Sequence, residues 1–347
     1  MAGVALTNVM YSGNDNNTKH LTYVPSRHSL TKIQMAKPSK KAMTSTARTE
    51  MTNPLDGIEL DANSLAPLNS VYCDEGYGIF LYEGDSLEVL DKVAQNYPEG
   101  CFDMIFADPP YFLSNGGITC HGGKMVKVDK GDWDKSRGAE ENHNFNREWL
   151  KRCQRVLKPN GSIWVTGTFH VIFSVGYAMQ QLGFKILNDI AWEKPNPPPN
   201  LSCRYFTHST ETIIWAAKSD KSSHVFNYSA MKSVTGKQMK TVWRRNELED
   251  SEKSAGVWTI ASPSADEKSF GKHPTQKPMA LLERCIIAST NEGDLILDPF
   301  LGGGTTAVAC AKLKRRCVGL DLSLEHVALA ARRVRAEFSQ PELNLVT

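Results

Sequence analysis

Short apolar runs alternate with helix-like segments along most of this chain, and that alternation restricts the fold more than any other feature. Residues 77–85 (YGIFLYEGD) predict a strand, and residues 86–100 (SLEVLDKVAQNYPEG) predict a helix with Ser86 as its N-cap. The run at 101–111 (CFDMIFADPPY) is almost continuously apolar, as in a strand buried on both faces of a parallel sheet. Strands that alternate with helices predict an α/β fold with a doubly wound, mostly parallel sheet.

The same rhythm continues through the middle and the last third of the chain. Polar residues that follow a strand are the first candidates for a site, because doubly wound sheets bind ligands at the carboxyl ends of their strands. Further strands are expected at 161–168, 184–193, 210–218, 294–300 and 316–322. Further helices are expected at about 145–156, at 170–182 and 278–290, after the glycines in 301–314, and at 323–338.

Three segments break the alternation. Residues 1–60 are rich in Ser, Thr, Asn and Lys and carry a net positive charge, which predicts a disordered tail or an arm that touches a polyanion or a partner subunit. Residues 112–143 combine two Gly-Gly pairs with many charges, so we expect a long mobile loop. Residues 219–270 lack the strand–helix rhythm and contain the basic run KSVTGKQMKTVWRR, which indicates an insertion into the α/β core.

Composition and cysteine spacing narrow the function classes. With 41% hydrophobic and 22% charged residues the chain has ordinary globular composition, and its net charge of +2 says little about partners. The eight cysteines form no C-x-x-C pair and no Cys/His cluster with zinc spacing, so we expect free thiols in a reducing, cytoplasmic compartment and no metal site. No apolar run is long enough to span a membrane and no apolar signal core is present, which predicts a soluble protein.

The stretch LDPFLGGGTT at 297–306 places an acid at the end of a strand, then three glycines, then a helix start. Glycines let the backbone approach a ligand closely, and the helix presents free N–H groups. Asp321 ends the next strand, where a carboxylate can accept hydrogen bonds from both ribose hydroxyls of a nucleoside. The turn fits neither G-x-x-x-x-G-K-[ST] nor G-x-G-x-x-G, which disfavours a nucleoside triphosphate, nicotinamide or flavin site. A tight turn that needs glycine only for packing is the alternative.

The apolar run at 101–111 ends in Asp108, Pro109, Pro110 and Tyr111. Asp108 and the Pro109 carbonyl are acceptors, and an exocyclic amine of a nucleobase offers two N–H donors. Acceptors aimed at those hydrogens draw the nitrogen toward tetrahedral geometry and favour its attack on an electrophile. Tyr111 can stack on the base, which is worth about 1–3 kcal/mol, and the prolines stiffen the turn. The motif fits an amine that is held and activated; a common turn with Tyr111 capping the core is the alternative.

These motifs resemble those of the DNA amino-methyltransferases, which use S-adenosylmethionine. DPPY at 108–111 resembles their catalytic motif, DPFLGGGTT at 298–306 their cofactor turn, and KHPTQKPMALLERCI at 272–286 the stretch before that turn in the β group. The order of the motifs is the β arrangement, and the resemblance covers roughly residues 75–335. The turn departs mildly from the commoner F-x-G-S-G-T. The resemblance implies a Rossmann-like methyltransferase fold with an inserted target-recognition region.

The resemblance also implies a division of the chain and a role for each matched residue. The parts are the tail 1–60, a catalytic half 61–218 with the loop 112–143, a target-recognition insertion 219–270 and a cofactor half 271–338. The target base is held and activated by Asp108, Pro109, Pro110 and Tyr111. The cofactor is bound by Asp85 at its adenine, Asp321 at its ribose, His273, Thr275 and Lys277 near its methionine, and by Asp108, Asp298, Phe300, Leu301, Gly302, Gly304 and Thr305.

The implied activity is methyl transfer from S-adenosylmethionine to the N6 amine of an adenine in a specific DNA sequence, since an aspartate rather than a serine opens the catalytic motif. Three alternatives stay open: methylation at N4 of cytosine, methylation of RNA, and a catalytically idle nucleic-acid-binding protein of the same fold. Methylation at carbon 5 of cytosine would need a nucleophilic cysteine in a Pro-Cys context, which the sequence lacks.

An adenine inside a duplex cannot reach such a pocket, so it must be flipped out, and phosphate contacts supply part of the energy. The candidates for those contacts are Arg204, Lys232, Lys237, Lys240, Arg244 and Arg245; a solvated charged surface is the alternative. The expected partners are double-stranded DNA and a second copy of the chain in a homodimer. A cognate restriction endonuclease is a further candidate partner, as part of a restriction-modification system. The expected location is the bacterial cytosol.

Overall fold

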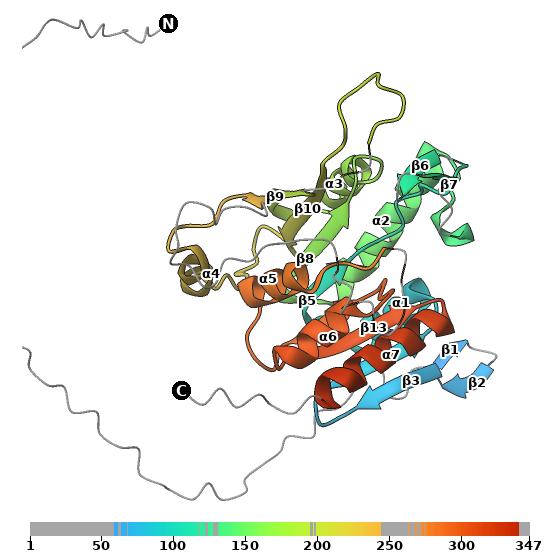
Figure 1. The fold of residues 1–347 in the computed structure, drawn as a ribbon. Coiled ribbons are helices and arrows are strands. Elements are labelled where there is room, and N and C mark those ends of the chain that lie inside the picture. Colours follow the sequence, from blue (N-terminus) through green and yellow to red (C-terminus); the bar gives the residue numbers. More distant parts are fainter. Residues whose placement is uncertain are drawn as a thin grey trace, which may run out of the picture. The chain divides into compact units, whose positions relative to one another are not determined.

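A mixed sheet forms the centre of the computed structural model (Figure 1). The structure describes residues 59–61, 64–67, 69–116, 118–121, 124–127, 131–194, 197, 199–243, 263, 267, 269, 271, 273 and 275–339. A first unit, Met1–Arg48, lies outside them, and everything below concerns the second unit, Thr49–Thr347. The predicted tail, apart from Glu59 and Leu60, and the predicted DNA-binding residues Arg244 and Arg245 therefore lie outside the described residues.

Five neighbouring strands of the sheet run parallel. In spatial order they are β8 (Leu157–Gly167), β5 (Phe102–Ala107), β12 (Leu295–Asp298), β13 (Arg316–Asp321) and β4 (Ile79–Glu83). Beyond β8 the sheet continues with the antiparallel strands β10 (Thr210–Ala217) and β9 (Lys185–Glu193), and β11 (Val242–Trp243) pairs parallel with β9. At the other edge β3 (Asn69–Asp74) pairs antiparallel with β4. The predicted mostly parallel sheet is confirmed.

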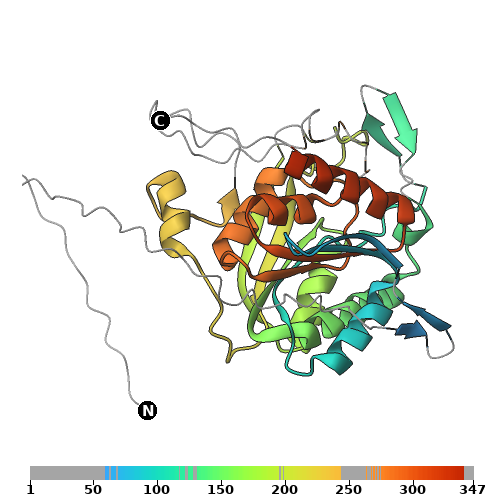
Figure 2. The same cartoon turned by 90° about the horizontal axis from the view of Figure 1, so that it is seen from below.

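Helices cover both faces of the sheet (Figure 2). One face packs against α1 (Ser86–Asn96), α2 (Ala139–Val156) and α3 (Ile172–Gln181), and the other against α5 (Met279–Ser289), α6 (Thr305–Lys312) and α7 (Leu324–Ser339). Phe102 and Ile105 of β5 belong to the first core, whereas Met104 and Phe106 belong to the second. Burial on both faces explains why β5 reads as a continuous apolar run, and it confirms the doubly wound fold. In the described part of the chain no helix is long and apolar enough to cross a membrane.

Several elements differ from the sequence-based expectation. The predicted loop 112–143 contains the hairpin β6 (Ile118–His121) and β7 (Lys124–Lys127), the short 3₁₀ helix η1 (Asp132–Asp134) and the first turn of α2. The described part of the insertion 219–270 contains α4 (Tyr228–Thr235) and β11. A pair of short strands, β1 (Glu59–Asp61) and β2 (Ser64–Pro67), precedes β3. These elements are short or polar, so they leave little hydrophobic periodicity in the sequence.

The N-cap of α1 is Asp85 and not Ser86 as expected. Asp85 has extended backbone angles, and its Oδ1 accepts a hydrogen bond from the Leu87 N–H at 2.8 Å. Ser86 is the first helical residue and is buried. Aspartate and serine are about equally good N-caps, so their order in the sequence could not decide between them.

The cysteines fall into two groups. Cys153, Cys285, Cys310 and Cys317 are buried free thiols in the two cores, as expected for cysteines in apolar runs. Cys73 and Cys203 are exposed and Cys101 is partly buried, so the expected burial does not hold for every cysteine.

Candidate active site

The carboxyl ends of four parallel strands meet at one edge of the sheet, and predicted site residues follow each of them. Asp108 comes directly after β5, Asp298 ends β12, Asp321 ends β13 and Asp85 lies just beyond β4. All of them line one cavity of about 510 Å³. The parallel arrangement therefore brings residues from both halves of the chain into one site.

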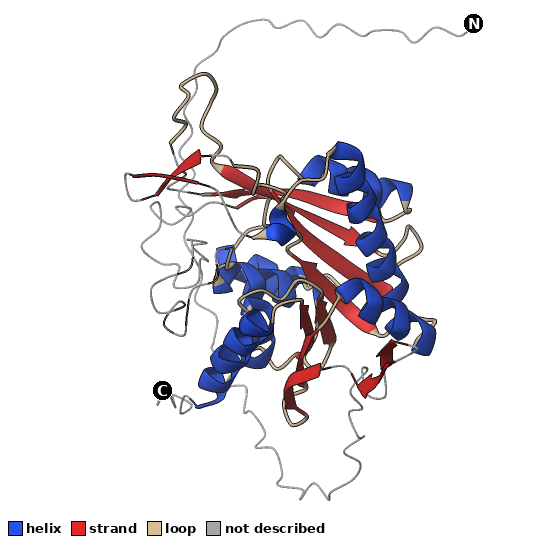
Figure 3. Ribbon diagram, turned by 90° about the vertical axis from the view of Figure 1, so that its right-hand side faces the viewer, coloured by secondary structure: helices blue, strands red, loops and turns tan. Residues whose placement is uncertain are grey.

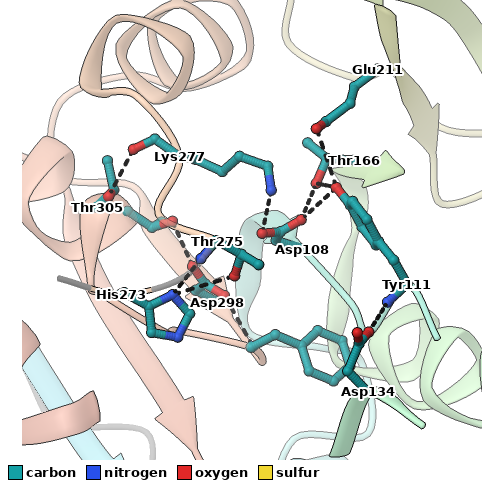
Figure 4. Close-up of polar contacts among 12 residues, drawn as sticks. Asp108, Tyr111, Asp134, Thr166, Glu211, His273, Thr275, Lys277, Asp298 and Thr305 are labelled. Carbon is teal, nitrogen blue, oxygen red and sulfur yellow. Dashed lines mark hydrogen bonds and ion pairs between the residues drawn. The ribbon is translucent and has the colours of Figure 1, made fainter. Parts of the chain in front are cut away.

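Asp108 lies at the centre of a buried hydrogen-bond network (Figure 4). Its Oδ1 accepts from the Tyr111 hydroxyl at 2.8 Å and from the Thr166 hydroxyl of β8 at 2.6 Å. Its Oδ2 accepts from the Lys277 ammonium at 2.5 Å. The side chains of Asp108 and Lys277 are only 14% and 9% exposed, so water screens this ion pair poorly.

The network fixes the charge of its members. Burial opposes ionisation of Asp108, but the Lys277 ammonium and the hydrogen bonds outweigh it and hold the pKa of Asp108 below its ordinary value. Burial also opposes the charge on Lys277, yet Asp108 and Glu211 raise the pKa of Lys277. Burial and the Asp108 charge hold the pKa of Tyr111 well above its usual range. At neutral pH the site contains a carboxylate, an ammonium and a neutral phenol.

Tyr111 lies with its ring covered and its hydroxyl directed into the protein. The side chain is 6% exposed, and its hydroxyl also lies 3.4 Å from Oε2 of Glu211, a buried residue of β10 that pairs with Lys194. Pro110 lines the main cavity, while Pro109 and Tyr111 border a small hollow beside it. In this arrangement the Tyr111 hydroxyl positions Asp108. The Tyr111 ring is covered and does not line the main cavity, which differs from the expected stacking of this ring on the base; Pro110 lines the cavity instead.

A buried carboxylate that the sequence did not mark, Asp134, anchors the catalytic turn. Its Oδ1 accepts from the Tyr111 N–H at 3.0 Å, and its Oδ2 accepts from the Leu113 N–H at 3.1 Å and the Ser114 hydroxyl at 2.9 Å. Asp134 is fully buried within η1, next to Trp133, which lines the cavity. The only signal in the sequence was an Asp-Trp-Asp triplet in a polar segment, and that pattern does not distinguish a buried anchor from a surface turn.

The glycine turn is shaped by the absence of side chains. Gly302 and Gly304 have φ angles of +49° and +75°, a backbone conformation that L side chains rarely adopt. A Cβ at Gly304 would lie 2.3 Å from the Cβ of Ala330 in α7, so glycine is required there for packing as well. The turn thereby brings the start of α6 against α7.

Asp298 stabilises this turn from inside. Its Oδ1 accepts from the Phe300 N–H at 3.0 Å and its Oδ2 accepts from the Thr306 hydroxyl at 2.5 Å. Burial raises the pKa of Asp298 to about 7, although both hydrogen bonds act in the opposite direction. Both of its oxygens are thus committed to holding the turn closed around the cavity.

The pKa of Asp321 is shifted in the opposite direction to that of Asp298. Its Oδ2 accepts from the Gly302 N–H at 2.9 Å, and its Oδ1 accepts from the Ser323 N–H at 2.9 Å and lies 3.2 Å from Nδ1 of His326. Burial opposes its ionisation, but these bonds outweigh burial and hold the pKa of Asp321 below its ordinary value. The His273 ring packs edge-on against His326, with ring centroids 4.4 Å apart. Burial and His326 lower the pKa of His273 to about 4, so this imidazole is neutral at physiological pH.

The structure brings nearly all predicted cofactor residues together. The main cavity is lined by Asp85, Asp108, His273, Thr275, Lys277, Asp298, Phe300, Leu301, Gly302, Thr305 and Asp321. The exception is Gly304, which acts through its packing on α7. Further residues that line the cavity were not predicted from the sequence, among them Trp133, Arg137, Gln276 and His326.

Similarity to known proteins decides the family. A family model described as DNA methylase matches residues 102–332. The chain is 54% identical over 261 residues to the Type II methyltransferase M2.DpnII of Streptococcus pneumoniae, covering 75% of this chain and 90% of that protein. It is 47% identical over 254 residues to the Type II methyltransferase M2.MboI of Moraxella bovis, covering 73% and 86%. The chain belongs to the DNA methylase family. The predicted DNA methyltransferase activity and its cofactor, S-adenosylmethionine, are confirmed.

Solved structures of DNA methyltransferases share the fold. M1.HpyAVI, solved as a complex with SAM, is 26% identical with a TM-score of 0.51, covering 74% of this chain and 99% of that one. The PvuII DNA methyltransferase, described as cytosine-N4-specific, is 20% identical with a TM-score of 0.54, covering 74% and 86%. These likenesses confirm the Rossmann-like methyltransferase fold.

The residues of this DNA methylase fit its cofactor. The cavity has the size of a small-molecule site, and the ionised Asp321 lies beside the glycine turn, where it can accept from ribose hydroxyls. Gln276 Oε1 is buried and accepts no hydrogen bond from any described residue, so it remains available to a donor such as an α-ammonium group. A Cβ at Gly303 would come within 3.1 Å of His273, and its absence leaves the backbone open to close approach.

The four predicted DNA-contacting residues that the structure describes do not line this cavity. Arg204 is exposed in the loop between β9 and β10. Lys232 is exposed on α4, and Lys237 and Lys240 are exposed between α4 and β11.

Proposed function

We propose that this enzyme methylates the N6 amine of an adenine that is flipped out of duplex DNA at one short sequence. The observation that carries the proposal is the ionised Asp108 at the carboxyl end of β5, in the same cavity as the glycine turn. A carboxylate in that place is a strong acceptor for an amine hydrogen.

Asp108 has room for such a hydrogen. A carboxylate has about four lone-pair sites, and hydrogen bonds from Tyr111, Thr166 and Lys277 use three of them. The remaining site is on Oδ2, because both bonds from hydroxyl groups go to Oδ1. The Pro109 carbonyl is the second acceptor that we assign to the amine. Together they favour the charge that develops on the nitrogen as it attacks.

The low pKa of Asp108 determines how it acts. A carboxylate paired with Lys277 is too weak a base to remove a proton from an aromatic amine, so it orients and polarises the amine while its proton stays in place. Once the nitrogen carries a methyl group and a positive charge, it is a strong acid, and even this carboxylate or water can accept the proton.

The remaining site residues hold the two substrates in line. S-adenosylmethionine supplies an electrophilic methyl group on a sulfonium. Asp321 accepts from the ribose, Asp85 contacts the adenine of the cofactor, and the glycine turn allows its close approach. Pro110 lies against the target base, and Tyr111 supports it from behind. Proximity and fixed charges then carry the catalysis.

Adenine is the base that we assign, because an aspartate opens the DPPY motif. Methylation of cytosine N4 would use the same acceptors on a similar exocyclic amine, so it is the alternative that the experiment below must separate.

DNA is held in this proposal by phosphate contacts of Arg204, Lys232, Lys237 and Lys240, together with Arg244 and Arg245 of the same basic run. We further propose that the enzyme is a homodimer in the bacterial cytosol and serves beside a cognate restriction endonuclease. A single species of monomer mass in sedimentation, with and without DNA, would contradict the dimer.

The proposal is tested by long-read sequencing with modified-base detection on DNA from a methylation-free bacterial host that expresses the enzyme. We expect N6-methyladenine at one short motif, and its absence in a host expressing Asp108→Ala. N4-methylcytosine at the motif would overturn the choice of base. No modification of DNA by the wild type would overturn the proposed function.

A further inference from the structure

The loop between β9 and β10 extends from the edge of the sheet at which the catalytic residues lie (Figures 1 and 3), and it carries exposed aromatic side chains. We call residues 199–209 the aromatic loop. Phe206 is 96% exposed and Tyr205 is 63% exposed. Adjacent large rings left so open to water mark an interaction surface more often than an inert one.

The aromatic loop is a built structure. The Asn200 amide donates to the Tyr205 carbonyl at 2.6 Å, and its Oδ1 accepts from both the N–H and the hydroxyl of Ser202. Cys203 has a φ of +52°, which turns the chain sharply before Tyr205. At the base, the Lys194 N–H donates to the Ser209 carbonyl at 2.7 Å. These contacts fix the backbone of the loop on both sides of Cys203 and at its base.

Stacked rings fasten the aromatic loop to the connection after β8. His208 stacks on Phe169 with centroids 4.0 Å apart, and Phe169 lies against His170 at 3.7 Å. Tyr205 lies 5.8 Å from His208 and extends the series outward. The four rings His170, Phe169, His208 and Tyr205 therefore form a connected series between the end of β8 and the aromatic loop, a column of rings in contact.

Two rings of this series are close in sequence to members of the catalytic network. Phe169 follows closely after Thr166, which donates to Asp108, and His208 closely precedes Glu211, which contacts the Tyr111 hydroxyl. The column thus rises from the residues that hold the catalytic carboxylate, at the edge where the duplex must lie for an adenine to reach it.

We propose that Tyr205 and Phe206 form a wedge that enters the DNA duplex and stacks on the bases left behind by the flipped adenine. Flipping a base breaks its stacking on both neighbours, and an aromatic ring placed in the gap restores much of that contact. Arg204, exposed beside the wedge, can bind the phosphate backbone there. The inference rests on the proposed function, and it names the group that keeps the duplex open.

The test uses two duplexes that contain the mapped methylation motif and differ only opposite the target adenine, which faces either thymine or an abasic site. An unpaired adenine leaves its helix at lower cost, so it depends less on a wedge. We expect Phe206→Ala to lower kcat/KM about 5- to 100-fold on the paired duplex, the range that loss of one base–aromatic stack implies, and clearly less on the abasic duplex. Phe206→Trp should restore the rate on the paired duplex.

Tyr77→Ala is the matched control. Tyr77 is 55% exposed and stacks on Phe338, but it lies in the turn before β4, at the opposite edge of the sheet. We expect it to methylate both duplexes at the wild-type rate. An equal loss on both duplexes for Phe206→Ala, or no loss on either, would overturn the wedge. Absence of N6-methyladenine from the wild type would instead overturn the proposed function, so the two failures are distinguishable.

Discussion

The two turns that meet in the cavity fix their backbones in opposite ways. The catalytic turn after β5 is held by charged side chains: Asp108 pairs with Lys277, and the buried Asp134 accepts hydrogen bonds from Tyr111, Leu113 and Ser114. The glycine turn after β12 accepts hydrogen bonds at Asp298 as well, but its packing requires that a side chain be absent, since a Cβ at Gly304 would collide with α7. Removing a charge should therefore destabilise the catalytic turn, and adding a side chain should destabilise the glycine turn.

Lys277 connects the two turns. Its ammonium donates to Asp108 of the catalytic turn, and its carbonyl accepts from the Thr305 hydroxyl at 3.1 Å, at the end of the glycine turn (Figure 4). A single residue thus sets the charge of one turn and the position of the other. The predictions below probe this contrast.

Removing the charge of Lys277 should have the largest effect on stability. Lys277→Met leaves Asp108 buried without its counter-charge, and we expect the free energy of unfolding to fall by about 3–5 kcal/mol. Urea unfolding at pH 7 measures it. The double variant Lys277→Met with Asp108→Asn removes both charges and should recover much of the loss. A single variant as stable as the wild type would show that the ion pair does not hold the catalytic turn.

Substitution by alanine should have different effects on stability at two neighbouring glycines. Gly304→Ala combines a left-handed backbone with a clash on Ala330, and we expect a loss of about 2–4 kcal/mol and weaker binding of S-adenosylmethionine. Gly303→Ala is the control, since Gly303 has no positive φ and its neighbours are side-chain atoms at 3.1 Å or more. Urea unfolding should rank the two variants clearly; cofactor affinity is not used for the ranking, because Gly303 itself lines the cavity. Equal effects would mean that packing on α7 does not shape the turn.

Asp134 tests the anchoring of the catalytic turn. Asp134→Asn replaces one acceptor oxygen by a donor that faces hydrogen-bond donors, and we expect a loss of about 1–3 kcal/mol and a lower kcat. Asp132→Asn is the control for stability, because the side chain of Asp132 is 92% exposed and its ion pair is with the exposed Lys135. Changing Asp132 should leave stability unaltered. A kcat for Asp134→Asn equal to the wild type would contradict the anchoring role.

The smallest expected effect is a pH dependence from Asp321 and His326 beside the glycine turn. The folded pKa of Asp321 is lowered, so its contribution to stability is present above its unfolded pKa and is lost as the pH falls through the folded value. The folded pKa of His326 is raised, mainly by Asp321, so its contribution is full below the unfolded value and is lost as the pH rises through the folded one. Both contributions are present together between about pH 4 and 6.5.

His326→Gln should therefore be less stable than the wild type at pH 6 by no more than about 1 kcal/mol, with a smaller difference at pH 8. Urea unfolding of both proteins at the two pH values measures this. A difference that grows from pH 6 to pH 8 would contradict the assigned pairing.

The sequence was informative where a function depends on adjacent residues. DPPY and the glycine turn are contiguous, and β5 is buried on both faces, so motif and strand could be predicted together. The ion pair of Asp108 with Lys277 joins residues far apart in the chain, and only the packing of β5 against the segment before α5 brings them together. Asp134 was missed for the same reason: its partners lie about 20 positions earlier, and its burial depends on tertiary contacts.

The central claim is that the ionised Asp108 acts on the target amine. Its most direct test is the single-turnover rate of methyl transfer by Asp108→Asn, at saturating DNA and S-adenosylmethionine. The substitution keeps the shape of the side chain but removes the charge that polarises the amine. We predict a rate about 10²- to 10³-fold below that of the wild type, because one preorganised electrostatic contact to the reacting group is lost. A rate equal to that of the wild type would contradict the claim.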